Sequence, residues 1–496
     1  MYQEPHIYEY LFQSLVLQFE CGAFSGGQAF PSQQQLCRQY NVGITTVRKV
    51  MKMLNDCGYI QTSSGLPATV IYQAAHEDFI STLASRRSEI ADCYQGMKLL
   101  LPQLYREGAK LCGKSELKAM QKIVDGITDD MEVSMLYRQA NDFLTITLQP
   151  FRNQLITDLE IDEENYLHIP YIPADDTDDP FYRSAFHMKN WLQTAHNRIE
   201  QKQFNEFYAS ILRTYHDTGR RVDRYLSILS KHAAEVSLSK KNMLWFRTKG
   251  HSELYSRLAM TIMRRILNGE FEGQKYLPSI PGLMEEYGVM KETASRAVKL
   301  LNTLGFTRTI DKKGTVIATD DFRSVKGRVD FNEPVIRNRL ILFLDALQIL
   351  ALTTRNCVSE FPRVSEEVIC EMEKNLNMTD KDQISPQAVQ ILMNYMIHSA
   401  PCHSLQNIYQ QLNELLLWGN YLLFADETLY PDTSSVSRTT ADIADALRTR
   451  EQAALPELTE RFFSQSYEGI YSLVARLMNG AENLPVFLTR TPVRRS

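Results

Sequence analysis

The sequence lacks the cysteine patterns and the long apolar runs that mark metal-stabilised, disulfide-linked or membrane-embedded proteins. Its eight cysteines form no C-x-x-C pair and no zinc-ligand spacing, and their dispersal suggests a reducing cytoplasm. The longest apolar run, Leu340 to Leu352, is interrupted by Asp345 and Gln348 and is too short to span a bilayer, so it predicts a buried helix. The first residues show no signal-peptide pattern. We therefore expect a cytoplasmic protein without a membrane segment.

A strong net charge and the common catalytic motifs are also absent. The chain has 54 Lys and Arg against 59 Asp and Glu, and its pI near 6.1 excludes a protein that coats nucleic acid through bulk charge. Any nucleic-acid site must therefore be a local patch. The sequence contains no G-x-G-x-x-G, G-x-x-x-x-G-K-[ST], H-E-x-x-H or G-x-S-x-G motif. We predict neither an enzymatic activity nor a cofactor.

What the sequence does contain is a pattern of three short helices followed by a hairpin. Helical periodicity and capping residues predict helices over Tyr8 to Glu20, Ser32 to Tyr40 and Thr45 to Cys57. Two short strands are predicted at 59–62 and 69–72, around a turn. Three helices closed by a small hairpin make a winged helix-turn-helix.

The same pattern recurs 247 residues later. Thirteen residues of the first unit meet the same residue type at this offset, in register and without a gap. Among them are Pro31-Ser32, which recurs as Pro278-Ser279, and Gly58, which recurs as Gly305. Identities at a fixed offset predict an internal duplication.

The remainder of the chain shows helical periodicity, with Met131 to Leu159 and Arg183 to Leu229 among the long patterns. We predict a mainly α protein with two winged helix-turn-helix domains, each followed by an all-α helical bundle. The predicted domains are a first winged helix-turn-helix at 1–75, an all-α domain at 76–240, a second winged helix-turn-helix at 248–320, a second all-α domain at 325–485 and a basic tail at 486–496.

A winged helix-turn-helix points to double-stranded DNA as the partner. The second helix of the motif fits the major groove, while flanking polar and basic groups hold phosphates. The candidate DNA-binding residues are Ser32, Gln34, Thr45, Thr46, Arg48, Lys49 and Gly65 in the first unit, and Ser279, Lys291, Thr293, Ser295, Arg296, Lys312, Lys313 and Gly314 in the second.

Both units resemble the DNA-binding domain of the GntR family of bacterial transcription regulators. The resemblance lies in Phe30-Pro-Ser-Gln-Gln-Gln-Leu and Tyr40-Asn-Val-Gly-Ile-Thr-Thr-Val-Arg, and again in Leu277-Pro-Ser-Ile-Pro-Gly-Leu and Tyr287-Gly-Val-Met-Lys-Glu-Thr-Ala-Ser. It implies a transcription regulator. Members of the family bind palindromes as homodimers, so a chain with two such units is expected to be a monomeric pseudo-dimer or a homodimer.

Three DNA-contacting arginines of the family are mostly replaced. Their positions hold Gln34, Ile44 and Arg48 in the first unit and Pro281, Lys291 and Ser295 in the second. An arginine that makes bidentate base contacts contributes roughly 1–3 kcal/mol of discrimination. Weaker or differently specified DNA binding with unequal half-sites is therefore expected. The alternative is a non-enzymatic interaction protein whose winged helices dock protein partners instead of DNA.

The helical segments resemble the all-α effector domain, of the FCD type, that follows the winged helix in one GntR subfamily. This resemblance implies a small-molecule effector, which the sequence does not identify. The metal-binding version of that domain uses an aspartate and three histidines, but here Phe143-Leu144 stands where the family has Phe-His. His196 and His216 are spaced like two such ligands, and surface or singly hydrogen-bonded histidines are the alternative. We predict no metal site.

Overall fold

The computed structural model describes most of the helical chain. The described residues are 7–20, 24, 26–40, 42–63, 67–72, 84–131, 133–167, 185–230, 245, 254–267, 270–271, 273–317, 330–362, 366, 369–370, 372, 386–425, 432, 434–478, 480 and 484–486.

The N-terminal unit consists of three helices and a two-stranded antiparallel hairpin. Its elements are α1 (Ile7–Glu20), α2 (Gln33–Gln39), α3 (Ile44–Asp56), β1 (Ile60–Gln61) and β2 (Thr69–Val70). A capping box starts α2, because the Ser32 side chain accepts from the Gln35 N–H while the Gln35 side chain accepts from the Ser32 N–H. After α3, Gly58 adopts a φ of 79°, which a residue with a Cβ rarely adopts, and the chain turns into the hairpin. The predicted winged helix is therefore present at this position.

The core of this unit is separate from that of the rest of the chain. Leu11, Leu15 and Phe19 line the buried side of α1 and pack against the inner faces of α2, α3 and the hairpin. Phe19 stacks on Phe30, with ring centroids 5.5 Å apart. The unit thus has a hydrophobic cluster of its own.

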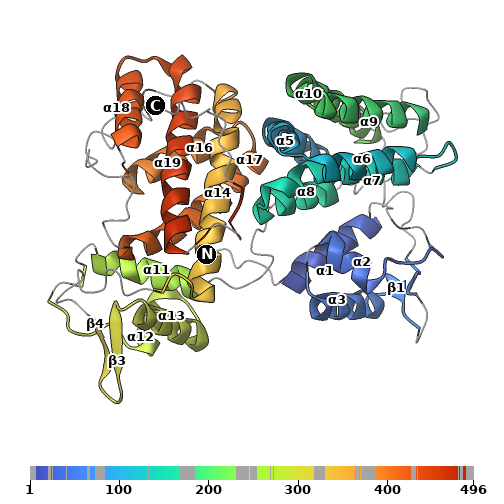
Figure 1. The fold of residues 1–496 in the computed structure, drawn as a ribbon. Coiled ribbons are helices and arrows are strands. Elements are labelled where there is room, and N and C mark those ends of the chain that lie inside the picture. The colour runs from blue at the N-terminus through green and yellow to red at the C-terminus, as the bar shows by residue number, and fades with distance from the viewer. Residues whose placement is uncertain are drawn as a thin grey trace.

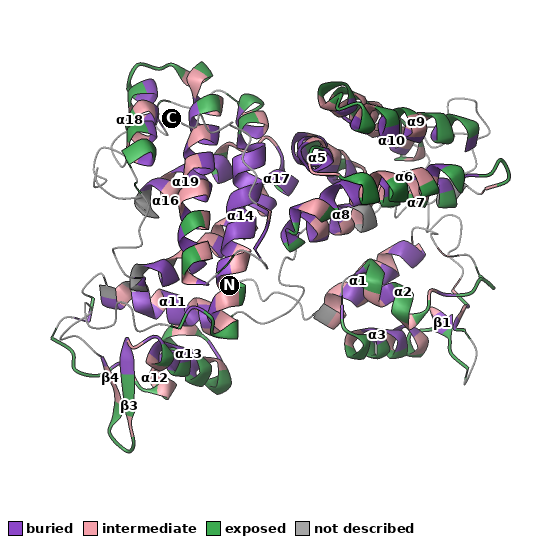
Figure 2. Cartoon of the chain, viewed as in Figure 1, coloured by how far each residue is buried: buried purple, intermediate pink, exposed green. Residues whose placement is uncertain are grey.

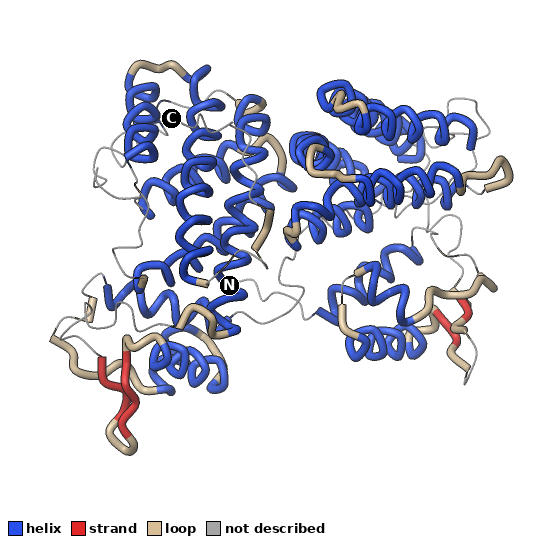
Figure 3. The backbone as a smooth tube through the Cα atoms, in the orientation of Figure 1, coloured by secondary structure: helices blue, strands red, loops and turns tan. Residues whose placement is uncertain are grey.

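The same order of elements follows after residue 253. It comprises α11 (Leu254–Leu267), α12 (Ile280–Tyr287), α13 (Lys291–Thr303), β3 (Thr307–Ile310) and β4 (Gly314–Ile317). In the first hairpin Ile60 pairs with Val70, and in the second Thr307 pairs with Ile317, each partner lying 247 positions further on. Figure 3 shows strands only in these two hairpins of the described chain.

The first helical half lies between the two units in the sequence. It contains α5 (Arg87–Ala109), α6 (Lys114–Asp125), α7 (Val133–Leu148), η1 (Gln149–Phe151), α8 (Gln154–Leu167), α9 (Ala185–Glu200) and α10 (Phe204–Ser230). The expectation of continuous helical patterns over 131–159 and 183–229 is wrong at two turns. Arg152, after Pro150, and Lys202 have φ values of 53° and 59°, which end one helix before the next begins.

The second helical half completes the described chain. It contains α14 (Pro334–Ser359), α16 (Pro386–Ser399), α17 (His403–Leu416), η3 (Leu417–Phe424), α18 (Ser434–Arg448), η5 (Gln452–Ala454) and α19 (Leu455–Leu477). The buried helix predicted from Leu340 to Leu352 is the centre of α14, which Figure 2 shows buried over most of its length. Among the described helices, none combines the length and hydropathy needed to cross a bilayer. The predicted mainly α fold with an N-terminal winged helix is confirmed.

The two helical halves meet along α5 and α14, the first long helix of each half. In addition, α5 contacts α17 of the second half, and α14 contacts α8 of the first half. Each long helix therefore packs against the other and against a helix of the opposite half. In Figure 1 both three-helix units lie on the same side of these helical halves.

Polar groups cross this seam, the contact between α5 and α14, and reach the starts of helices in the opposite half. The two oxygens of Asp92 on α5 accept from the backbone N–H groups of His403 and Ser404, both at 2.7 Å, where α17 begins. Asn153, just before α8, donates from its amide to the backbone carbonyl oxygen of Asp345 on α14 at 3.0 Å and accepts from the Ile156 N–H at 3.1 Å, where α8 begins. Burial raises the pKa of the Asp345 carboxyl well above its ordinary value. Helix N-termini leave N–H groups without intrahelical partners and favour negative charge. At the seam, each half thus supplies hydrogen-bond acceptors to residues at a helix start of the other half.

Asp92→Ala tests the capping contact across the seam. Loss of the carboxylate leaves two N–H groups without their acceptor, which we expect to cost about 1 kcal/mol locally. Hydrogen exchange of the His403 and Ser404 amides should then become roughly fivefold faster. Asp129→Ala, an exposed residue in the turn after α6, is the control and should leave these amides unchanged. Equal protection in the Asp92 variant and the parent would contradict the capping role.

Candidate nucleic-acid interface

Helix α3 presents a polar face opposite its buried side. Val47, Val50, Met51 and Leu54 face the core of the first unit. On the opposite face Thr45, Arg48 and Lys49 are exposed and Thr46 is half-buried, so the structure brings these candidates to one surface. Gly65 lies outside the described residues.

The contacts of α3 with α2 limit the freedom of its arginine. The Arg48 Nε donates to Oε1 of Gln33 at 3.3 Å. Gln34, the neighbouring candidate on α2, is exposed. The Arg48 side chain is thus positioned beside the start of α2.

Helix α13 repeats this arrangement with different side chains. Lys291, Ser295 and Arg296 are exposed, and Thr293 is half-buried. Just before the helix Met290 is 78% exposed, the largest exposure among the large hydrophobic side chains of the described chain. The surface at this helix start is therefore part apolar and part cationic.

One cation on α3 and one on α13 lies over a tyrosine ring of the first helix of its unit. The Lys49 ammonium is 3.0 Å from the ring centroid of Tyr8, and the Arg296 guanidinium is 4.0 Å from that of Tyr255. Both members of one pair lie 247 positions after those of the other. Cation–π contacts of this kind contribute roughly 0.5–1 kcal/mol at exposed sites. Sequence reasoning selected the two cations as DNA contacts but missed the tyrosines, although Tyr8 and Tyr255 were identical at this offset.

The two candidate serines act as helix caps. The Ser32 Oγ accepts from the Gln35 N–H, and the Ser279 Oγ accepts from the Gly282 N–H, both at 3.3 Å. Both side chains are exposed. Because each oxygen is an acceptor here, its hydroxyl hydrogen can still be donated to a phosphate.

Asparagine side chains connect each hairpin to the third helix of its unit. In the first unit Oδ1 of Asn55 accepts from the N–H of Thr62 at 2.9 Å. In the second, Asn302 accepts from the Thr307 hydroxyl at 2.7 Å and donates to Oγ1 of Thr309 at 2.8 Å. These bonds fix the angle between helix and wing.

The wing of the second unit carries a cationic tip. Lys312 and Lys313 are exposed at the turn between β3 and β4. Lys312 has a φ of 57° and Gly314 one of 111°, which make the tight turn. Neither lysine side chain has an ion-pair or hydrogen-bond partner within the described chain. The tip can therefore reach a phosphate backbone without breaking a contact.

The two histidines with ligand-like spacing have separate contacts. His196 is buried, and its Nε2 is 3.1 Å from the carbonyl oxygen of Leu117. His216 is exposed, with Nδ1 3.1 Å from Asp217. In the described part of the chain, no group of three or more His, Cys, Asp or Glu is arranged to hold a metal ion. His196 is thus a core histidine with one hydrogen bond, and His216 is a surface histidine.

Residues 6–70 match the sequence model of the family described as "Bacterial regulatory proteins, gntR family". Among solved structures the chain is similar to "Streptococcus agalactiae GntR", with 13% identity and a TM-score of 0.22 over 43% of this chain and 99% of that chain. It is also similar to a structure titled "Lar controls the expression of the Listeria monocytogenes agr system and mediates virulence", with 10% identity and a TM-score of 0.19 over 45% and 99% of the two chains. No curated protein matches. The family match supports a DNA-binding transcription regulator.

Asn302→Ala tests the link between helix and wing. Loss of both hydrogen bonds should destabilise the second hairpin by about 1 kcal/mol and speed exchange of its strand amides roughly fivefold. Thr303→Ala is a matched control, because the Thr303 hydroxyl bonds only to the Lys299 carbonyl of its own helix. If the two variants exchanged alike, Asn302 would not hold the wing.

Proposed function

We propose that the chain is a transcription regulator in which two winged units of one polypeptide read the two halves of one operator. The recurrence of the same helices, hairpin and contacts at an offset of 247 residues supports this proposal most strongly. The hairpin register, the serine cap and the cation over a tyrosine each occur twice at this spacing. A tandem duplication of one ancestral unit accounts for all three.

The seam between the helical halves supports a covalent pseudo-dimer. A two-fold interface uses the same surface on both partners, so that each contact occurs twice with the roles exchanged. The packing of α5 on α17 and of α14 on α8 follows this rule. We propose that the seam stands where the interface of a homodimer would be and that the chain binds its operator as a monomer.

The two half-sites should differ in sequence. Ile44 and Arg48 of α3 correspond to Lys291 and Ser295 of α13. An isoleucine and a lysine make different base-edge or phosphate contacts, so one operator half cannot satisfy both helices equally. The predicted target is therefore an imperfect palindrome.

The helical halves are proposed to be FCD-like effector domains. In this proposal the winged helices occupy 1–75 and 248–320, the effector domains occupy 76–240 and 325–485, and residues 486–496 form a basic tail. A ligand that prefers one arrangement of the halves would change the spacing of the two recognition helices and hence the affinity for DNA.

Docking of a protein partner is the second candidate function. The observation that favours it is the apolar start of both recognition helices, with Ile44 39% and Met290 78% exposed. A docking module would show no preferred DNA site and only a shallow salt dependence. A regulator would show a steep fall of affinity with salt and a preferred sequence.

The proposal is tested by assigning each recognition helix to one half-site. A preferred duplex is selected in vitro with the full chain, and fluorescence anisotropy is measured for Arg48→Ala and Lys291→Ala. Each variant should weaken binding about tenfold and relax base preference in one half only, a different half for each. Lys118→Ala on α6 is the control for loss of a distant exposed charge. Effects of both variants on the same half-site, or on neither, would contradict the proposal.

The wing tip gives a separate electrostatic prediction. The double variant Lys312→Gln with Lys313→Gln should make the negative slope of log affinity against log salt shallower by roughly two, because two phosphate contacts are lost. Lys118→Gln with Lys122→Gln on α6 removes the same charge far from the wing and should leave the slope unchanged. Equal slopes for the wing variant and the parent would show that the tip does not contact the backbone.

A further inference from the structure

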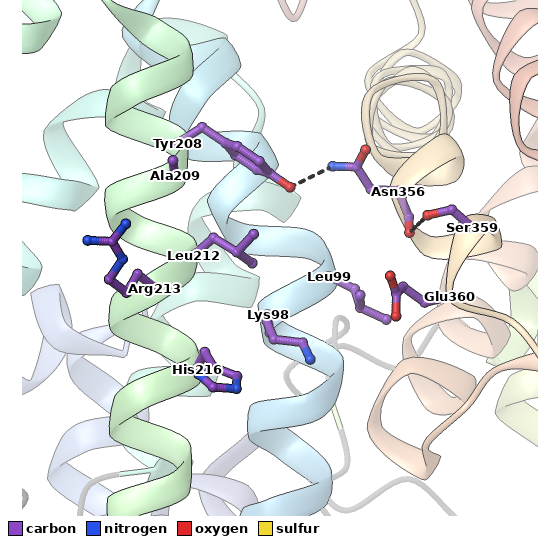
Figure 4. Close-up of a pocket in the computed structure, with 10 residues that line it drawn as sticks. All are labelled: Lys98, Leu99, Tyr208, Ala209, Leu212, Arg213, His216, Asn356, Ser359 and Glu360. Carbon is purple, nitrogen blue, oxygen red and sulfur yellow. Dashed lines mark hydrogen bonds between the residues drawn. The ribbon is translucent and has the colours of Figure 1, made fainter.

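A groove of about 470 Å³ opens at the seam between the two helical halves. Its walls are α5 and α10 of the first half and the end of α14 of the second (Figure 4). The lining residues are Lys98 and Leu99 on α5, Tyr208, Ala209, Leu212, Arg213 and His216 on α10, and Asn356, Ser359 and Glu360 at the end of α14. A volume of this size holds a small organic molecule.

The groove carries opposite charges on opposite walls. Lys98 and His216 make one side of the groove basic and Glu360 follows α14 on the other, while the Arg213 guanidinium points away from α14 in Figure 4. Within the described chain neither Lys98 nor Arg213 has an ion pair, and neither does Glu360. His216 contacts its neighbour Asp217 at 3.1 Å. Cationic and anionic groups thus share one groove without neutralising each other.

The middle of the groove separates these charges with apolar and hydrogen-bonding groups. In Figure 4 Leu212 points from α10 toward α14, and the Leu99 side chain lies beside Glu360. Nδ2 of Asn356 lies 3.4 Å from the Tyr208 hydroxyl, to which it donates across the seam, and the Ser359 hydroxyl donates to the Asn356 carbonyl at 2.8 Å. The contact between Asn356 and Tyr208 joins the α14 wall to the α10 wall, and the contact between Ser359 and Asn356 lies within α14.

We propose that this groove binds a small zwitterion, a free amino acid or a short peptide. The ligand carboxylate would lie against Lys98, its ammonium against Glu360, and its apolar part over Leu99 and Leu212. A simple anion would satisfy only the basic wall and would leave Glu360 facing the negative charge. A ligand with both charges satisfies both walls.

The regulatory consequence rests on the proposed function. A zwitterion in this groove joins α5 and α10 of one half to α14 of the other. It therefore favours the arrangement of the halves in which the walls stand one ligand length apart. Because a winged unit accompanies each half, binding would change operator affinity.

Binding is tested on the full chain without DNA. The standard amino acids are titrated singly by calorimetry, and the best binder is compared with its N-acetyl form and its carboxamide. We expect saturable binding of the amino acid. Each derivative should bind at least about tenfold more weakly, because each lacks one of the two charges. Saturable binding by none of the amino acids, or equal binding of the N-acetyl form, would overturn the proposal.

Two variants assign the charges to their walls. Glu360→Gln should weaken the amino acid about tenfold and abolish the difference from the N-acetyl form, and Lys98→Gln should abolish the difference from the carboxamide. Glu200→Gln, an exposed residue at the end of α9, is the matched control and should bind like the parent. Unchanged affinity in both groove variants would overturn the site.

The proposed operator binding and the proposed groove can be contradicted independently of each other. The groove is measured without DNA, and operator binding is measured without an amino acid. Operator binding without any amino-acid binding overturns the groove alone. Amino-acid binding without a preferred operator overturns the regulator and leaves the groove established.

Discussion

The seam between α5 and α14 is the constraint on which the arrangement of the chain depends. The Asp92 carboxylate of the first half caps the start of α17, and the Asp345 carbonyl oxygen of the second half accepts from the Asn153 amide beside the start of α8. Asn153 adds a buried bond across the same seam, from its amide to Oε1 of Gln348 at 3.0 Å. Buried polar groups cost free energy when they lose their partners, so sliding or separation of the halves is opposed at several points at once.

The two three-helix units are attached to this framework in different ways. The first has its own hydrophobic cluster and contacts the helical half through the Tyr10 hydroxyl, which donates to Asp162 at 2.7 Å. Burial and the Asp162 charge raise the pKa of Tyr10 well above its ordinary value, so it stays a donor near neutral pH. The core of the second unit is continuous with the main cluster of the helical halves. A change in the seam is therefore transmitted to the second unit through packing and to the first through fewer contacts.

Local sequence signals predicted the N-terminal winged unit well because its helices are capped and amphipathic. The pair Pro31-Ser32 marked the start of α2, and Gly58 marked the turn after α3. Periodicity failed at Lys202, since a lysine in the left-handed region carries no sequence signal. The tyrosines beneath Lys49 and Arg296 and the charged walls of the groove arise from contacts between distant segments. Such contacts are set by tertiary packing, which periodicity does not encode.

The central claim is that one chain provides both readers of an operator. Native mass spectrometry of the complex with the selected duplex measures this stoichiometry directly. The account predicts one chain of 57.1 kDa per duplex, with both half-sites protected from nuclease. Two chains on one duplex, each protecting a half-site with only one of its winged units, would contradict it.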